Sequence, residues 1–181
     1  MLLIHTCCTD CVLKLIASLK EELAIQNNEI TLFFYNPNIH PRSEYLARMD
    51  ALKKMIEPHG YKIVFPHWRP VEYFDTVGKL KKADRSDKTK RCPLCWFVRL
   101  HATFAYAKEH GFSQVTTTLL TSTYQDTKAI REVATKLSGQ FDIPFYVPKK
   151  VVCDLETKGF YKQNYCGCVY SLAERMEEKF G

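Results

Sequence analysis

Three cysteines stand close together near the start of the chain, within HTCCTDC, from His5 to Cys11. Cys8 and Cys11 have a C-x2-C spacing, and the same spacing recurs in RCPLC, from Arg91 to Cys95. Paired thiolates at this spacing hold a structural zinc ion, hold an iron–sulfur cluster or exchange disulfides. The spacing alone leaves these three chemistries open.

A further pair of cysteines lies near the other end of the sequence, in YCGC, from Tyr165 to Cys168. A closed zinc site takes four ligands, so it would leave half of the eight cysteines without a role. This excess of sulfur makes a purely structural zinc site a poor explanation of the whole pattern.

The composition excludes some classes of protein. Apolar residues make up 46% of the 181 residues, and no apolar run approaches the length of a membrane span, so we expect a soluble protein. The opening MLLIHTCC has neither a basic leader nor a long apolar stretch, which argues against a secretory signal and for a cytoplasmic protein. In that reducing compartment, cysteines serve metal binding or redox chemistry more often than structural disulfides.

Short apolar runs rich in β-branched and aromatic residues predict strands, and they alternate with segments of helical spacing. The predicted strands are 2–6, 30–36, 61–68, 114–120 and 144–148. The predicted helices are 12–25, 43–56, 71–82, 92–110, 124–137 and 169–180. Such alternation gives βαβ crossovers and a mostly parallel sheet. We therefore expect an α/β protein with a single Rossmann-like three-layer domain over residues 1–181.

Loops at the carboxyl ends of parallel strands gather at one edge of the sheet, where such folds bind ligands. Cys7 and Cys8 follow the first predicted strand, so we expect the metal site at this edge. Polar residues follow two other strands and are candidates for substrate contact: Asn36, Asn38, Arg42, Tyr124 and Gln125. Tight turns also use asparagine and proline, so turn chemistry explains the first of these segments equally well.

Charge indicates the kind of partner. The formal net charge is +6, and the stretch from Lys79 to Arg91 has seven basic residues against two acidic ones. A solvated helix end is the common explanation of such a run, but its position just before the second cysteine pair suits it to bind phosphates. Unstacked RNA bases could stack on aromatic side chains, of which the candidates are Trp68, Tyr73, Trp96 and Tyr124.

Five segments, taken together, carry a resemblance that covers nearly the whole chain. They are HTCCTDC, FFYNPNIHPRSEYLAR, RCPLCWFVRLHATFAYAKEHGF, VTTTLLTSTYQD and YCGCVYS. In this order they resemble the QueH family of cobalamin-independent epoxyqueuosine reductases. The resemblance implies reductive removal of the epoxide oxygen of epoxyqueuosine in the anticodon loop of tRNA, which gives queuosine in the last step of its biosynthesis. It also implies a 4Fe-4S cluster, an external electron donor and no cobalamin.

The resemblance implies roles for particular cysteines. The implied cluster ligands are Cys7, Cys8, Cys92 and Cys95, and the implied redox-active pair is Cys166 and Cys168. A disulfide between residues i and i+2 is strained and easily reduced, which suits exchange. Cys11 would lie one turn inside the first helix, close enough to bind a second iron or zinc ion. Asp10 could bind that ion or donate a proton, although a helix cap is the commoner role of such a residue.

The chain also departs from the family pattern, and two rival functions remain. The family more often has a small residue and proline where this chain has Thr9 and Asp10, and often has proline in place of Thr123. An ATP-dependent tRNA sulfur-transfer enzyme would also use a Rossmann-like sheet, but no Ser-Gly-Gly phosphate loop follows the first strand. A zinc-binding module for tRNA fits the charge and the spacing, but it leaves the C-x-C pair without a function.

Overall fold

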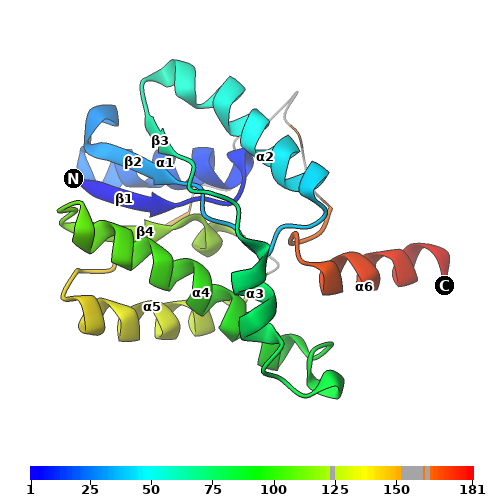
Figure 1. The fold of residues 1–181 in the computed structure, drawn as a ribbon. Helices are drawn as coiled ribbons and strands as arrows, with labels where there is room; N and C mark the ends of the chain where they lie inside the picture. Colours follow the sequence, from blue (N-terminus) through cyan, green and yellow to red (C-terminus); the bar gives the residue numbers. More distant parts are fainter. Residues whose placement is uncertain (123–124, 152–160, 162–163) are drawn as a thin grey trace.

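A parallel sheet forms the centre of the molecule. The computed structural model describes residues 1–122, 125–151, 161 and 164–181, and Figure 1 traces their fold. The strands are β1 (Leu2–His5), β2 (Ile30–Phe33), β3 (Lys62–Val64) and β4 (Gln114–Thr117). Within the described residues the sheet has four strands in the order β3-β2-β1-β4, and every neighbouring pair is parallel.

Helices cover both faces of this sheet (Figure 1). They are α1 (Thr9–Leu23), α2 (Arg42–Met55), α3 (Pro70–Val77), α4 (Lys88–Glu109), α5 (Thr127–Phe141) and α6 (Val169–Phe180). Successive side chains of a strand point to opposite faces, so Leu2 and Ile4 of β1 share a core with α1 and α2, whereas Leu3 shares a core with α4 and α5. The expected α/β architecture of three layers with a parallel sheet is confirmed.

The predicted fifth strand, 144–148, is not a strand among the described residues. Phe145 forms one isolated parallel bridge with Val115 of β4. Pro144 and Pro148 bracket the segment, and proline has no N–H to donate to a strand ladder. The segment therefore runs along the β4 edge of the sheet with a single point of pairing.

Several helix boundaries differ from those that we predicted from the sequence. α1 begins at Thr9 instead of residue 12, and α5 spans Thr127–Phe141 instead of 124–137. α4 begins at Lys88 instead of residue 92, because the Asp87 carboxylate caps it by accepting the Thr89 amide at 2.9 Å. Pro93 therefore lies inside the helix and not in its first turn. α3 ends at Val77, where Gly78 follows, instead of continuing to residue 82.

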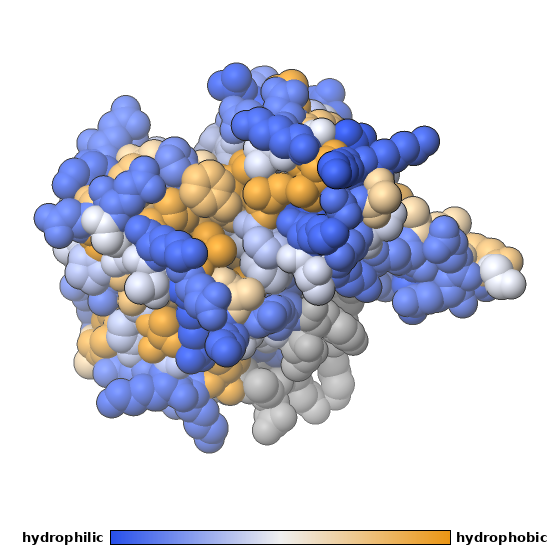
Figure 2. Space-filling model, turned by 90° about the horizontal axis from the view of Figure 1, so that it is seen from below, coloured by the Kyte–Doolittle hydropathy of each residue, from blue (hydrophilic) through white to orange (hydrophobic). Residues whose placement is uncertain are grey.

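The last helix, α6, extends away from the sheet, beyond α3 (Figure 1), and none of its residues is buried. Figure 2 shows the underside of the molecule, where hydrophilic side chains surround smaller apolar areas and α6 projects at the right. None of the helices in the described residues has the length and the apolar character needed to cross a membrane.

Candidate functional site

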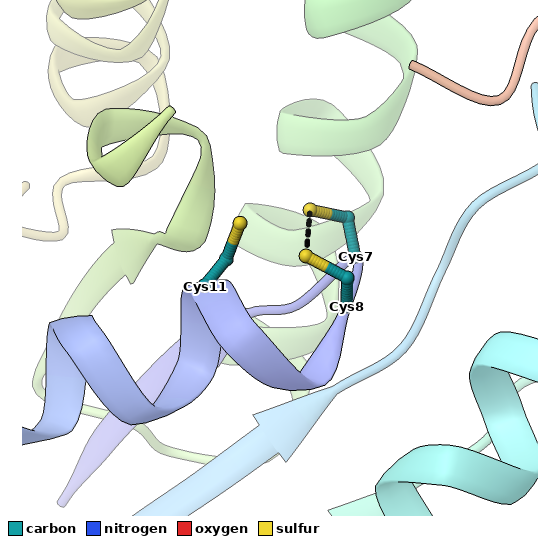
Figure 3. Close-up of side chains that lie close together, drawn as sticks. All are labelled: Cys7, Cys8 and Cys11. Carbon is teal, nitrogen blue, oxygen red and sulfur yellow. Dashed lines mark hydrogen bonds between the residues drawn. The ribbon is translucent and has the colours of Figure 1, made fainter. Parts of the chain in front are cut away.

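The first cysteine group lies where β1 ends and α1 begins. β1 stops at His5, and Cys8, in an extended conformation, is the N-cap residue of α1. Because the chain turns here, the adjacent Cys7 and Cys8 can face the same space. The Sγ atoms of Cys7, Cys8 and Cys11 all lie within 4.8 Å of one another, and Figure 3 shows them converging. This group could hold a metal ion.

The three thiols share protons. Hydrogen bonds from Cys11 and Cys8 lower the pKa of Cys7 well below its ordinary value. Hydrogen bonds with Cys7 and Cys8 raise the pKa of Cys11 well above it. A hydrogen bond from Cys11 favours the Cys8 thiolate, but the hydrogen bond with Cys7 and burial outweigh it and raise the pKa of Cys8 to about 12. These contacts therefore favour the thiolate of Cys7 over those of Cys8 and Cys11.

Thr118 fixes Cys7 from the neighbouring strand. It begins the short 3-10 helix η4 (Thr118–Thr121), directly after β4. Its hydroxyl oxygen accepts a hydrogen bond from the Cys7 amide at 3.2 Å and lies 3.3 Å from Cys7 Sγ. The carboxyl ends of two adjacent strands therefore build this cysteine group together, as the topology of the sheet predicts.

The other two cysteine pairs line a common pocket. Cys92 and Cys95 come from α4, and Cys166 and Cys168 from the segment that leads into α6. Burial raises the pKa of Cys95 to about 12 and also raises the pKa of Cys92. The remaining lining residues are Asn38, Tyr73, Arg91, Trp96, Arg99 and Gln125. The structure thus brings the C-x2-C pair of α4 to the C-x-C pair, which lies more than seventy positions later in the sequence.

Arg99 connects this pocket with the first cysteine group. It lies one turn after Cys95 on α4 and is only 4% exposed. Its guanidinium donates to Asn36 Oδ1 at 2.9 Å and to His5 Nε2 at 3.3 Å. Its positive charge favours the thiolate forms of both Cys7 and Cys95. We did not select Arg99 from the sequence, although a spacing of four residues places it on the same helix face as Cys95.

His5 supports Arg99 from the end of β1. Burial, together with the charge of Arg99, lowers the pKa of His5 to about 3, so the ring is neutral. A guanidinium can only donate, so His5 Nε2 accepts and Nδ1 donates to Thr117 Oγ1 at 2.8 Å. The histidine is therefore a satisfied core residue that orients the buried cation.

Arg48, on α2, holds the segment between the last two cysteines. Its side chain is 2% exposed and donates to the carbonyl oxygens of Tyr165 at 3.2 Å and Cys166 at 3.3 Å. Gly167 has a φ of 111°, and a Cβ at this position would lie 3.3 Å from the Arg48 guanidinium. Glycine is therefore required here both by the backbone conformation and by the close approach of Arg48.

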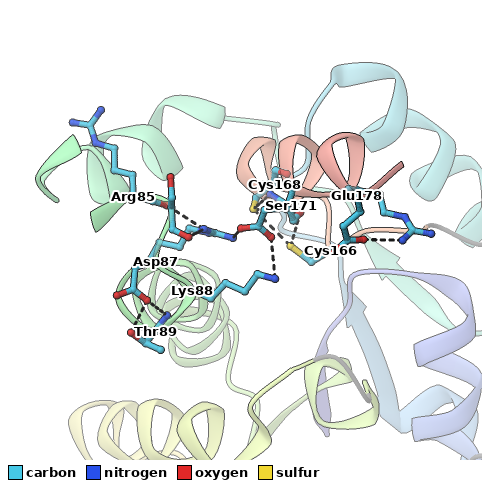
Figure 4. A network of polar contacts seen from close by, with 12 residues as sticks. Arg85, Asp87, Lys88, Thr89, Cys166, Cys168, Ser171 and Glu178 are labelled. Atoms are coloured by element: carbon cyan, nitrogen blue, oxygen red, sulfur yellow. Dashed lines mark hydrogen bonds and ion pairs between the residues drawn. The ribbon is translucent and has the colours of Figure 1, made fainter. Parts of the chain in front are cut away.

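Cys168 is the more acidic member of its pair. It is the N-cap residue of α6, and its Sγ accepts a hydrogen bond from the Ser171 amide at 3.4 Å. Hydrogen bonds from Cys166, Ser171 and Tyr73 lower the pKa of Cys168 to about 5, and the hydrogen bond with Cys168 raises that of Cys166. The two Sγ atoms lie 3.7 Å apart, and Figure 4 shows both beside Ser171. The pair is in its dithiol form.

The predicted substrate residues differ in their availability. Asn38 and Gln125 line the pocket, and Asn38 Oδ1 is buried with no hydrogen-bond partner among the described residues. Gln125 Oε1 accepts the indole N–H of Trp96 at 2.9 Å. Asn36 uses both ends of its amide within the protein, since Nδ2 donates to a backbone carbonyl at 2.8 Å and Oδ1 accepts from Arg99. Substrate contact by these three residues stays a prediction.

Two of the rings proposed for stacking on bases are inaccessible. Tyr73 is 1% and Trp96 is 5% exposed, because both pack into apolar clusters that wall the pocket, so the prediction was wrong for them. Trp68 is half-buried in a separate groove, where the Arg42 guanidinium lies 6.0 Å from its ring centre. Tyr124 lies outside the described residues, as Thr123 does.

Asp10 lies in the first turn of α1, beside the first cysteine group. It forms an ion pair with Lys14 at 2.9 Å, one turn further along the helix. The N-cap position belongs to Cys8, so Asp10 does not cap α1. A carboxylate in the first turn is nevertheless favoured by the helix dipole.

Some residues of the basic stretch are exposed to solvent, and others are engaged in contacts within the protein. Lys79, Lys81 and Lys82 are exposed. Arg91 is 2% exposed, and it pairs with Glu174 of α6, which also binds Lys88 at 3.0 Å. Part of the positive charge counted in the sequence therefore serves to hold α6 against α4.

The donor set of the site fits a thiolate-bound metal group. All seven cysteines in the described part of the chain are free thiols. Thiolates are soft ligands that select zinc or iron–sulfur clusters, and ligation displaces the protons that burial otherwise keeps on Cys8 and Cys95. The buried guanidinium of Arg99 offers a positive charge that offsets the negative charge of several thiolates.

Known proteins with similar sequences identify the family of this chain. The family model described as epoxyqueuosine reductase QueH matches residues 2–174. The QueH epoxyqueuosine reductase of Dehalococcoides mccartyi is 32% identical over 97% of this chain and 94% of its own length. Those of Thermotoga maritima and Histophilus somni are each 29% identical, over 97% and 96% of this chain and over 92% and 72% of their own lengths. The chain belongs to the QueH family of epoxyqueuosine reductases.

Proposed function

We propose that this protein reduces the epoxide of epoxyqueuosine in tRNA to the alkene of queuosine, as a single catalytic domain acting in the cytoplasm. The observation that carries the proposal is the gathering of thiols at the carboxyl edge of the sheet. Three lie together after β1, four line the adjoining pocket, and Arg99 interacts with members of both groups. Membership of the QueH family supplies the substrate.

The proposal gives four cysteines to a 4Fe-4S cluster: Cys7, Cys8, Cys92 and Cys95. Such a cluster supplies electrons at low potential when it is bound. Cys11 remains for a second iron or zinc ion, since its Sγ belongs to the same thiol group as Cys7 and Cys8. Thr118 orients Cys7 by hydrogen bonding, and the buried Arg99 compensates the charge of the thiolates.

The C-x-C pair matches the stoichiometry of the reaction. Removal of an epoxide oxygen as water consumes two electrons and two protons. Oxidation of Cys166 and Cys168 from a dithiol to a disulfide releases the same number of each. Because both cysteines line the pocket, the pair can deliver electrons and protons for one turnover before an external donor reduces it again.

Asn38 is the best-supported candidate for substrate contact. Its Oδ1 is a buried acceptor that lacks a partner among the described residues, and its side chain lines the pocket together with the C-x-C pair. A hydroxyl group of the substrate could donate to this oxygen. An unpaired buried acceptor costs roughly 1–3 kcal/mol, which such a contact would recover on binding.

A direct test uses anaerobically prepared protein, a chemical reductant and tRNA that carries epoxyqueuosine. The tRNA is digested to nucleosides after the reaction, and mass spectrometry measures epoxyqueuosine and queuosine. We expect repeated conversion to queuosine in the presence of the reductant, at most one turnover per enzyme in its absence, and none with the Cys8→Ala variant. No conversion by metal-loaded protein, under conditions in which a relative from the family is active, would contradict the proposal.

A further inference from the structure

The two members of the C-x-C pair have different surroundings. Cys166 is an exposed residue, whereas Cys168 is only 4% exposed. Cys168 packs with Tyr73 and Val77 of α3 in a small apolar cluster. A molecule arriving from solvent therefore meets the sulfur of Cys166 first.

Hydrogen-bond donors surround the buried sulfur. Cys168 Sγ accepts a hydrogen bond from the Ser171 amide at 3.4 Å, at the first turn of α6, whereas the Ser171 hydroxyl donates to the Cys168 carbonyl oxygen at 3.0 Å. The hydroxyl group of Tyr73 also hydrogen-bonds this sulfur. Amides at a helix N-terminus and hydroxyl donors stabilise a thiolate. A negative charge is thus better accommodated on Cys168 than on the exposed Cys166.

The backbone between the two cysteines is fixed from both sides. The Gly167 carbonyl accepts from the His40 amide at 2.7 Å, and the Cys166 carbonyl accepts from Arg48 at 3.3 Å. These hydrogen bonds fix the backbone between the two cysteines and keep Cys166 at the surface. The backbone therefore holds the two cysteines in different surroundings, one exposed and one buried, without any rearrangement of side chains.

We propose that the external electron donor of this protein is a dithiol and that it always attacks the same sulfur, that of Cys166. This inference rests on the redox role that the proposed function gives to the pair. A thiolate of the donor attacks Cys166 Sγ in the oxidised pair, so a bond forms between the donor sulfur and Cys166. The bond between the two protein sulfurs breaks, and its electron pair stays on Cys168 as a thiolate.

The second thiol of the donor completes the exchange. It attacks the donor sulfur in the mixed disulfide, which closes the donor's own disulfide and releases Cys166. The donor loses two electrons and two protons. The protein gains the two electrons, one proton returns to Cys166, and the other goes to Cys168 or to solvent. The exposure of Cys166 and the burial of Cys168 give the exchange its direction, because the donor reaches only the exposed residue.

The first experiment locates the attack. Full-length metal-loaded protein with an oxidised pair is mixed anaerobically with glutathione, a monothiol that cannot complete the second step. Acid quenches the reaction at short times, free thiols are alkylated, and tandem mass spectrometry maps the peptide that carries both cysteines. We expect glutathione on Cys166 and the alkyl group on Cys168. Glutathione on Cys168, or equal labelling of the two, overturns the proposed direction.

The second experiment tests the surroundings of the leaving sulfur. Tyr73→Phe should slow reduction of the oxidised pair by dithiothreitol roughly three- to tenfold, because it removes a hydrogen bond to the Cys168 thiolate. Tyr170→Phe, in the first turn of α6, is the matched control and should leave the rate unchanged. An unchanged rate in the Tyr73 variant would refute the stabilising role.

The third experiment tests the class of donor without any tRNA. Dithiothreitol should reduce the pair to completion, and dithionite-reduced methyl viologen, a one-electron donor, should reduce it at least tenfold more slowly. Faster reduction by the viologen would overturn the dithiol assignment. These outcomes are independent of the tRNA reaction, so a failure of the inference and a failure of the proposed function are distinguishable.

Discussion

Two helices of this protein begin with a cysteine at the N-cap, and their surroundings give the two sulfurs different chemistry. Cys8 begins α1 and is buried, and it lies in a group of three thiols with the half-buried Cys7 and Cys11. Cys168 begins α6 and has Cys166, an exposed residue, as its partner. The local backbone is similar, since both caps are extended. Both N-cap sulfurs are buried, so the number of neighbouring thiols and the exposure of the partner cysteine distinguish a site suited to a permanent metal ligand from one suited to an exchanging disulfide.

The two helices are also anchored in different ways. α1 buries apolar residues of its inner face against β1 and β2, so the first cysteine group rests on the core of the protein. α6 has no buried residues and is held to α4 by ion pairs of Glu174 with Lys88 and Arg91. A rigid support suits a site whose ligands must stay in place, and a peripheral helix suits a pair that must react with another molecule.

The largest expected effect comes from breaking the buried group. Cys8→Ala removes a predicted ligand and should strip the metal and abolish epoxyqueuosine reduction. The measurement is metal and acid-labile sulfide content after anaerobic purification, together with the tRNA assay. Cys166→Ser is the matched control and should retain its metal. Full metal content in the Cys8 variant would show that the two cysteine groups have been assigned the wrong roles.

The C-x-C pair should respond differently. Cys166→Ser and Cys168→Ser should keep the metal but lower the rate of multiple turnover by about a hundredfold or more, the scale of losing an essential proton-transfer group. A single turnover by prereduced enzyme should also be impaired, because the pair supplies its electrons. Wild-type rates in both variants would remove the pair from the mechanism.

Much of this arrangement was readable from the sequence. The parallel sheet followed from the alternation of apolar runs and helical spacing, and the position of Cys7 and Cys8 at its carboxyl edge followed from the sheet. The residues between the cysteine groups were not predictable in the same way. Arg99 and Arg48 look like surface cations in an amphipathic pattern, and only the tertiary contacts show that they are 4% and 2% exposed. Local spacing carries no information on such long-range pairing.

Tyr73 and Asp87 are two further residues whose roles could not be predicted from the sequence. Tyr73 was expected to be available to bases, but α3 packs on α4 and buries its ring against Cys168. Asp87 belonged to a stretch that we interpreted only by its charge, yet its carboxylate caps α4 and starts that helix four residues earlier than predicted. Side chains that form helix caps or pocket walls are identified by their contacts in the folded protein. Neither the composition nor the spacing of apolar residues in the sequence specifies those contacts.

Arg99 can test how the two cysteine groups are linked, because its charge acts on Cys7 of the first group and on Cys95 of the pocket. Arg99→Met should lower the free energy of unfolding by about 1–3 kcal/mol, since Asn36 Oδ1 loses its buried donor. In metal-loaded protein it should also make the reduction potential more negative, because a buried positive charge is lost near the thiolates. Urea unfolding and a redox titration measure the two effects. Arg131→Met, at an exposed position of α5, is the control and should change neither.

The smallest expected effect concerns tRNA binding by the basic stretch. Replacing Lys79, Lys81 and Lys82 by alanine should reduce the slope of log affinity against log salt by about 2, because fewer counterions are released on binding. Filter binding at several salt concentrations measures this slope. The control replaces three exposed lysines in later turns of other helices, Lys20, Lys108 and Lys136. Equal slopes for the two triple variants would mean that the stretch does not contact the phosphates.

The central claim is that the buried thiols hold an iron–sulfur cluster and not a structural zinc ion. The most direct measurement is the iron, acid-labile sulfide and zinc content of wild-type protein purified without oxygen. The account predicts a coloured protein with roughly four iron and four sulfide per chain, the content of a 4Fe-4S cluster. A colourless protein with stoichiometric zinc and no sulfide would contradict it.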